Sequence, residues 1–167
     1  MNNKLTKEAI TIRTEIKPGD LGYVIHRHGS MYAKEYNHGV SFEVYVAQGI
    51  CEFYDNYNPT KDKVWFCEHN NKIIGSLFLQ HRENNTAQLR YFYVENEFRG
   101  LGIGKMLMNL YIEFYKQCNY QSSYLWTTNE LDTAAAIYSK HGFLLSAEVS
   151  SNSFGKTLVE RKFERIL

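Results

Sequence analysis

The chain has 167 residues, 44% of them hydrophobic and 22% charged, so it is long enough to bury a sizeable core and falls in the size range of one domain. Its 19 Lys and Arg residues nearly balance its 18 Asp and Glu residues, which excludes a long-range electrostatic pull on nucleic acid or on an anionic membrane. The N-terminus is polar and no run approaches the roughly 18 apolar residues of a membrane span, so we expect a single cytoplasmic domain, residues 1–167, without nucleic-acid or membrane partners.

The first part of the chain predicts one short strand and two helices. The strand is expected at residues 11–14. Apolar and aromatic residues then recur at three- and four-residue steps over residues 21–36 and again over residues 41–57. Gly39 favours a stop after the first helix, and the Asn58-Pro59 pair closes the second.

From Val64 the period of the apolar residues changes to two, which predicts strands in an antiparallel meander. These strands are expected at residues 64–68, 72–80 and 86–94. The elements expected after them are a helix at 102–117, a strand at 124–127, a helix at 131–140 and strands at 143–149 and 158–163. This order implies a mixed sheet with helices on its faces, and a ligand at the carboxyl end of a central strand.

Three alternating glycines, Gly100, Gly102 and Gly104, lie where a predicted strand gives way to a predicted helix. The absence of Cβ atoms lets successive backbone amides point into one concavity, and the positive end of the helix dipole adds to their attraction for an anion. The segment therefore predicts a pyrophosphate site. A glycine-rich turn that only begins a helix is the alternative.

Two other phosphate-binding loops fail on spacing. A Walker A loop needs Gly five residues before its Gly-Lys pair and Ser or Thr after it, where this chain has Arg99 and Met106. A Rossmann GxGxxG motif needs a last glycine where the chain has Lys105 or Leu107. A nucleotide-phosphate binder is therefore disfavoured.

The segment Arg99-Gly100-Leu101-Gly102-Ile103-Gly104 resembles the acyl-CoA loop of GNAT acetyltransferases, (Arg/Gln)-x-x-Gly-x-(Gly/Ala). This resemblance implies an acetyl-CoA-dependent N-acetyltransferase that needs no metal. It also implies an α/β fold with a twisted, mostly antiparallel sheet of about seven strands and about four helices. The cofactor would be held by residues of this loop: Arg99, Gly100, Leu101, Gly102, Ile103, Gly104 and Lys105.

A second segment, residues 134–143, is similar to the family's A-x-x-(L/I)-Y-x-K-x-G-F signature. The tyrosine of that signature falls on Tyr138, which implies that Tyr138 binds CoA and protonates, or hydrogen-bonds, the departing CoA sulfur. A phenol has a reference pKa of about 10 and a thiol one of about 8.5, so a tyrosine stays protonated at neutral pH and is able to assist the sulfur. The alternative role for Tyr138 is an aromatic on an amphipathic stripe.

The resemblance also assigns the strand at residues 86–94 to the family's fourth strand. Main-chain groups of Phe92, Tyr93 and Val94 would then bind pantetheine, and a backbone amide there would stabilise the oxyanion. Some members carry a glutamate base where this chain has Gln88. The base is left open among three side chains and water: Glu83, His26 and His28.

Many members also hold pantetheine with an asparagine at the position of Leu131, and we predict that Asn129 takes its place. The first two helices would form a wall of the acceptor cleft. Candidate acceptor-site residues are His26, His28, Tyr32 and Gln88, with Arg27, Glu35 and Tyr36 as further contacts. The alternatives are a core histidine for His28 and solvated surface charges for Arg27 and Glu35.

Segments such as residues 19–22 and 26–32 resemble the acetyltransferase half of bacterial MarR-GNAT fusion proteins, without a DNA-binding half. The expected acceptor is a primary amine of a small molecule or of a protein. A non-catalytic acyl-CoA-binding or sensing module is the competing hypothesis. The polar turn at residues 150–155 is compatible with a homodimer, and the cysteines are expected to be reduced core thiols: Cys51, Cys67 and Cys118.

Overall fold

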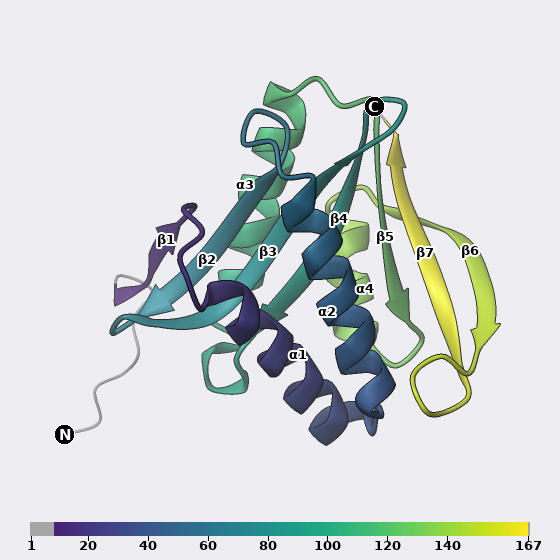
Figure 1. The fold of residues 1–167 in the computed structure, drawn as a ribbon. Helices are drawn as coiled ribbons and strands as arrows, with labels where there is room; N and C mark the ends of the chain where they lie inside the picture. The colour runs from purple at the N-terminus through teal and green to yellow at the C-terminus, as the bar shows by residue number, and fades with distance from the viewer. Residues whose placement is uncertain (1–8, 167) are drawn as a thin grey trace.

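The computed structural model describes residues 9–166, which form a seven-stranded sheet in the order β1-β2-β3-β4-β5-β7-β6 (Figure 1). Every pair of neighbouring strands is antiparallel except β4 and β5, which are parallel. The strands are β1 (Thr11–Arg13), β2 (Lys63–His69), β3 (Lys72–Arg82), β4 (Thr86–Val94), β5 (Ser122–Thr128), β6 (Leu144–Ser151) and β7 (Leu158–Ile166). The predicted mixed α/β sheet is confirmed.

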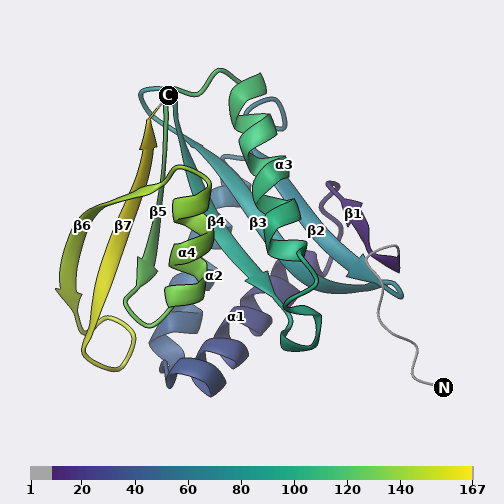
Figure 2. The ribbon, with the colours of Figure 1, turned by 180° about the vertical axis from the view of Figure 1, so that it is seen from behind.

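Four α-helices cover the two faces of the sheet. They are α1 (Asp20–Tyr36), α2 (Val40–Asp55), α3 (Ile103–Gln117) and α4 (Asp132–Lys140). Helices α1 and α2 lie in front of the sheet in Figure 1, and α3 and α4 lie on the opposite face, seen in Figure 2. A short 3-10 helix, η2 (Asn96–Phe98), follows β4 and was not expected from the sequence.

Each face of the sheet has its own hydrophobic cluster. On the α1/α2 face, Val46, Ile50 and Phe53 of α2 pack against β2, β3 and β4. On the α3/α4 face, Leu107 and Tyr111 of α3 belong to the other cluster, and both are fully buried. The helix stripes read from the sequence are thus the surfaces that hold the helices on the sheet.

The two central strands separate along most of their length. Strands β4 and β5 are paired only from Thr86↔Ser122 to Gln88↔Tyr124. The register of β3 and β4 shifts between Ser76 and Phe78, and Tyr91 has φ 51°. A bulge bends a strand and increases its twist, so β4 diverges from β5 and residues 89–94 have no partner on that side.

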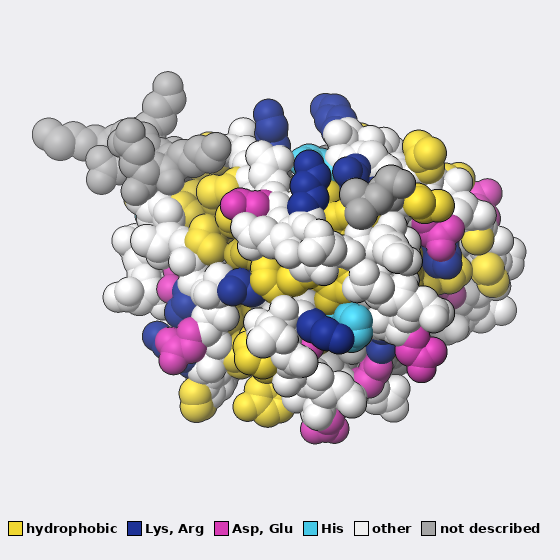
Figure 3. Space-filling model, turned by 90° about the horizontal axis from the view of Figure 1, so that it is seen from above, with side chains coloured by type: hydrophobic (Ala, Val, Ile, Leu, Met, Phe, Trp, Pro, Cys, Tyr) yellow, Lys and Arg dark blue, Asp and Glu magenta, His cyan; other side chains and the backbone are white. Residues whose placement is uncertain are grey.

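The surface carries charges of both signs. Seen from above, acidic and basic side chains are interspersed with hydrophobic ones (Figure 3). In the part of the chain described, no helix is both long and apolar enough to cross a bilayer.

The expectation of three core thiols is wrong in part. Cys67 on β2 is buried, and this burial raises the pKa of its thiol to about 12. Cys51, in contrast, is exposed, because it lies outside the stripe of α2 that faces the sheet. Cys118, just after α3, is intermediate.

Candidate active site

The glycine loop joins the end of β4 to the start of α3. Gly100 and Gly102 have φ of 81° and 79°, in the left-handed region that a residue with Cβ rarely adopts. Helix α3 begins at Ile103, and no acidic side chain occupies its first turn. Within residues 9–166, the amides of residues 100–105 bond to no loop carbonyl or side chain. The loop therefore presents a row of free donors at a helix N-terminus.

Close packing holds this helix start against the rest of the site. A Cβ added at Gly104 would lie 3.4 Å from Cδ1 of Ile137 on α4 and 3.5 Å from Cζ of Phe92 on β4. The glycine thus lets α3, α4 and β4 approach one another at the mouth of the gap between β4 and β5.

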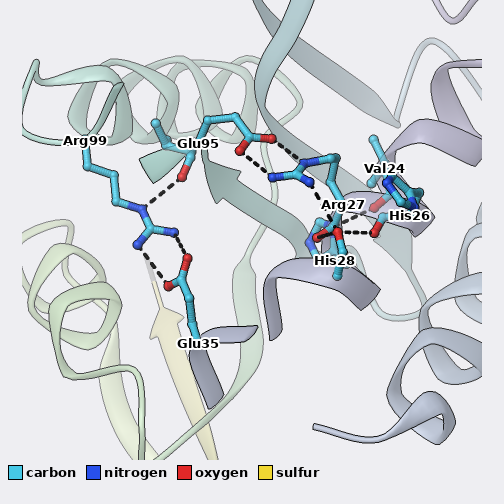
Figure 4. Close-up of polar contacts among 9 residues, drawn as sticks. Val24, His26, Arg27, His28, Glu35, Glu95 and Arg99 are labelled. Carbon is cyan, nitrogen blue, oxygen red and sulfur yellow. Dashed lines mark hydrogen bonds and ion pairs between the residues drawn. The ribbon is translucent and has the colours of Figure 1, made fainter. Parts of the chain in front are cut away.

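Two ion pairs tie α1 to the segment between β4 and the glycine loop (Figure 4). Arg99 binds Glu35 through two contacts of 2.9 Å, and its Nε donates to the carbonyl of Val94 at 3.0 Å. Arg27 binds both carboxylate oxygens of Glu95 at 2.5 and 2.6 Å. Arg27 and Glu35 are therefore ion-paired charges that keep partial contact with solvent, and neither lines the cleft.

An open cleft of about 100 Å³ lies between the separated strands and the α1/α2 hairpin. Aromatic side chains make up about half of its lining. The lining side chains come from α1 (His28, Tyr32), α2 (Phe42, Tyr45, Val46), β4 (Gln88, Leu89, Arg90, Tyr91, Phe92), β5 (Trp126, Thr127, Thr128), α4 and the residue before it (Tyr138, Leu131), and the β6–β7 hairpin (Phe154, Glu160).

Tyr138 lies in this cleft beside the unpaired part of β4. It is 5% exposed and its ring contacts those of Phe92, Phe143 and Phe163, with centroids 6.0 to 6.3 Å apart. Burial raises the pKa of its phenol. The hydroxyl bonds to none of the described residues, so it is able to donate to a ligand.

The predicted acceptor residues separate into two groups. His28, Tyr32 and Gln88 line the cleft, whereas His26 is exposed on α1 and does not. His28 Nδ1 contacts the carbonyl of Val24 at 2.9 Å, and burial lowers the pKa of the ring to about 4. The imidazole is therefore neutral at pH 7. His28 is both a buried, hydrogen-bonded histidine and a cleft residue.

The fold decides which of the candidate bases lie in the cleft. Glu83 is exposed in the β3–β4 turn and, like His26, lies outside the cleft. Gln88 accepts a hydrogen bond from Arg82 Nε at 2.8 Å. Glu160 of β7 is the one carboxylate among the lining residues within 9–166. No local sequence pattern marks Glu160, since its position opposite Thr128 depends on strand register.

Asn129 lies outside the cleft lining and is bonded to a neighbouring strand. Its Oδ1 accepts from the Val159 amide at 3.1 Å, and its own amide donates to the Val159 carbonyl at 2.9 Å. It joins the end of β5 to β7 and is exposed, while Leu131 lines the cleft. The side chain of Asn129 is thus directed to a neighbouring strand rather than to the cleft.

The titratable residues do not form a metal centre in the region described. Over residues 9–166, no three His, Cys, Asp or Glu side chains gather as metal ligands would.

Comparison with known proteins gives a family match. The model of the acetyltransferase (GNAT) family matches residues 29–143, more than half of the chain. A curated relative, the N-acetylaspartate synthetase of Danio rerio, is 36% identical over 86 residues. The match covers 51% of this chain and 30% of that protein, so the chain spans about a third of its relative's length.

Solved structures share the fold. A GNAT-family acetyltransferase from Staphylococcus aureus Mu50 superposes with a TM-score of 0.74 at 26% identity, over 95% of this chain and 99% of that one. A GNAT-family acetyltransferase from Elizabethkingia anophelis, solved with acetyl-CoA bound, superposes with a TM-score of 0.65 at 18% identity, over 96% and 100% of the two chains.

Proposed function

This chain belongs to the acetyltransferase (GNAT) family and is an acyltransferase, and we propose that it transfers the acetyl group of acetyl-CoA to a primary amine of a small molecule or of a protein. The observation that supports the proposal most is that three features occur together: the free amides of the glycine loop, the gap between β4 and β5, and Tyr138 in the cleft. We take residues 9–166 to act as one catalytic unit, and the likeness to MarR-GNAT fusion proteins stays a prediction.

The residues present fit an acyl-CoA. Backbone amides of residues 100–105 would hold the pyrophosphate, and their free donors at the start of α3 suit its charge. Main-chain groups of Phe92 and Tyr93 and the amide of Val94, which β5 leaves unpaired, would bond the pantetheine arm; the carbonyl of Val94 already accepts from Arg99. Asn129 is not included, because its side-chain oxygen is bonded to Val159. Arg99 would act through its backbone, since its guanidinium is paired with Glu35.

The chemistry then needs a donor to the oxyanion, a proton acceptor for the amine and a donor to the leaving sulfur. We assign the first to a backbone amide within residues 92–94 and the last to Tyr138. Glu160 would hold the acceptor ammonium and take its proton, directly or through water. We do not assign His28 this role, because burial lowers the pKa of its ring to about 4 and so disfavours the protonated form. Bringing the two reactants together in one cleft supplies much of the rate.

A non-catalytic acyl-CoA sensor is not favoured. Its two grounds are the glutamine at position 88 and the likeness to domains that are paired with regulators. The first is weakened because the cleft has a carboxylate elsewhere, Glu160, and the second stays a prediction.

Titration calorimetry with acetyl-CoA tests the cofactor site. The wild type is expected to bind, and Gly102→Glu is expected not to, because its side chain brings bulk and negative charge to the loop. Gly102→Ala is the matched control, since both variants bear the same strain at φ 79°. Equal binding of acetyl-CoA by the wild type and Gly102→Glu would show that the loop is not part of the cofactor site. Acetyl transfer is tested by measuring the free thiol that is released from acetyl-CoA in the presence of a library of amines. This release is expected to be lost in Glu160→Gln.

A further inference from the structure

We infer that the acceptor is an amine that also bears a carboxylate, in the manner of an amino acid, and that Arg90 binds this carboxylate near the point where the pairing of β4 with β5 ends. This inference rests on the proposed function and names the substrate class of the same site.

Arg90 is a buried charge with incomplete pairing. Its side chain is 9% exposed, and within residues 9–166 its guanidinium makes one hydrogen bond, from Nη1 to Gln80 Oε1 at 3.1 Å. An arginine has five N–H donors and remains charged at every pH of interest. A buried charge is costly unless it is paired and hydrogen-bonded. The guanidinium therefore has N–H donors left for a further anionic partner. Arg90 lines the cleft, so this partner would lie there.

Within residues 9–166, the one carboxylate within ion-pair distance of Arg90 is shared with a second arginine. Glu52 of α2 lies 3.5 Å from Arg90 Nη1, but its other oxygen accepts from Nη1 of Arg82. Two guanidiniums and one carboxylate leave one positive charge on this wall. Glu160 supplies one negative charge among the other lining residues. A molecule with one ammonium and one carboxylate complements both charges.

The bulge in β4 builds this arrangement. In a regular strand, adjacent side chains point to opposite faces, so Arg90 and Tyr91 would be separated by the sheet. Tyr91 instead has φ 51° and both side chains reach α2. A Cβ added at Gly49 would meet Arg90 Nη2 at 2.3 Å and the Tyr91 hydroxyl at 2.4 Å. That hydroxyl is buried and unpartnered within the described chain, so it is a second donor beside the guanidinium.

Strand register sets the order of the groups along the cleft. Continued from Gln88↔Tyr124, the parallel register puts Arg90 level with Trp126. Thr128, two residues further toward the open end, pairs with Glu160. Arg90 thus lies about 7 Å deeper than Glu160 along the strand direction. A carboxylate at Arg90 would leave the amine toward Glu160, in the cleft that Tyr138 also lines.

The test compares matched acceptors on the full chain. Each proteinogenic amino acid is paired with the amine that it would form on losing its α-carboxylate, and kcat/KM for acetyl transfer is measured for both. We expect the best acceptor to be a carboxylate-bearing member, favoured over its amine by at least about 30-fold, as for a buried charge pair. In Arg90→Gln this preference should fall by a similar factor, while KM for acetyl-CoA stays unchanged.

Two further variants separate the carboxylate contact from general effects. Gly49→Ala keeps the charge of Arg90 but displaces its guanidinium, so it should also lower the preference. Arg161→Gln removes a positive charge that is paired with Glu148, away from the cleft lining, and should leave the preference unchanged.

A decarboxylated amine or a peptide N-terminus as the better acceptor would overturn the inference, as would an unchanged preference in Arg90→Gln. Binding of acetyl-CoA without transfer to any carboxylate-bearing amine would also overturn it and leave the cofactor site standing. Failure to bind acetyl-CoA would instead be a failure of the proposed function.

Discussion

Tyr138 keeps its proton throughout the neutral range, because burial raises the pKa of its phenol above the ordinary value of about 10. A thiol of pKa about 8.5 is the stronger acid, so full transfer from Tyr138 to a thiolate is uphill. The hydroxyl would therefore act mainly by hydrogen-bonding the sulfur as negative charge develops there. Burial fits this role, since a hydrogen bond in a low-dielectric site is stronger than in water.

We predict that Tyr138→Phe lowers kcat by about 100-fold, the effect of losing one preorganised donor. KM for acetyl-CoA should change little, because the ring contacts with Phe92 and Phe163 are kept. Steady-state kinetics measure both constants. Tyr23→Phe, at a partly exposed tyrosine outside the cleft, serves as the control. If Tyr138→Phe kept the kcat of the wild type, the hydroxyl would have no catalytic role and Tyr138 would serve only in packing.

His28 links folding stability to pH. Burial lowers the pKa of its ring from 6.5 to about 4, so between these values the unfolded chain binds more protons than the folded one. Stability contributed by the neutral ring is therefore present above about pH 6.5 and is lost as the pH falls toward 4.

Between pH 7.5 and pH 5, we expect this residue to lower the free energy of unfolding by about 2 kcal/mol. Urea unfolding of the wild type and of His28→Leu at the two pH values isolates the contribution as a difference in pH dependence. His26→Leu, at an exposed histidine of the same helix, should behave like the wild type. The same pH dependence in His28→Leu and in the wild type would contradict the assignment.

At the scale of elements, α1 is fixed to the β4–α3 connection by two arginine-carboxylate pairs (Figure 4). The side chains of Arg27 and Glu95 are 25% and 13% exposed, and those of Arg99 and Glu35 are 41% and 25% exposed. Water screens the second pair more. The Arg99–Glu35 pair also joins α1 to the first residue of the glycine loop.

Double-mutant cycles should rank the two pairs. For Arg27→Gln with Glu95→Gln, we expect a coupling energy of about 1 kcal/mol, and for Arg99→Gln with Glu35→Gln about 0.5 kcal/mol, as for more exposed pairs. Chemical denaturation at low salt gives these energies, and added salt should reduce the second more. A larger coupling for Arg99 with Glu35 would show that exposure does not decide the order.

The regular elements could be predicted because their signals are local. The spacing of the apolar residues changes from three or four to two at the boundary between α2 and β2. Asn37, with φ 57°, ends α1 one residue after Tyr36. The glycine loop was located in the same way, by spacing along the chain. Such signals need no knowledge of distant contacts.

The acceptor side of the cleft could not be predicted, because tertiary contacts define it. A positive φ at Tyr91, a tyrosine inside a good strand pattern, has no sequence signature, yet it brings Arg90 onto α2. Glu160 enters the cleft only through the pairing of β7 with β5. The partners of Arg27, Glu35 and Asn129 lie 68, 64 and 30 residues away along the chain.

On the scale of the whole molecule, the sheet consists of two parts joined at one end. Strands β1 to β4 form one part and β5, β7 and β6 the other, and the β4–β5 pairing from Thr86↔Ser122 to Gln88↔Tyr124 connects them. Beyond these pairs the strands diverge, and α1 and α2 cover one side of the opening while α3 and α4 lie on the other (Figures 1 and 2). A ligand in the gap would contact both parts of the sheet and replace the missing strand pairing.

Hydrogen exchange measures this replacement directly. In the free protein, the amides of residues 89–94 that face the gap should exchange faster than those paired with β3. Saturating acetyl-CoA should slow exchange at residues 89–94 and 100–105 by at least about tenfold, since bound amides are protected. Peptides from β6, at the far edge of the sheet, should be unaffected. In Gly102→Glu, no segment should gain protection at the same ligand concentration, whereas Gly102→Ala should retain most of it. Protection at residues 100–105 without protection on β4 would mean that the pyrophosphate binds while the gap between the strands takes no part.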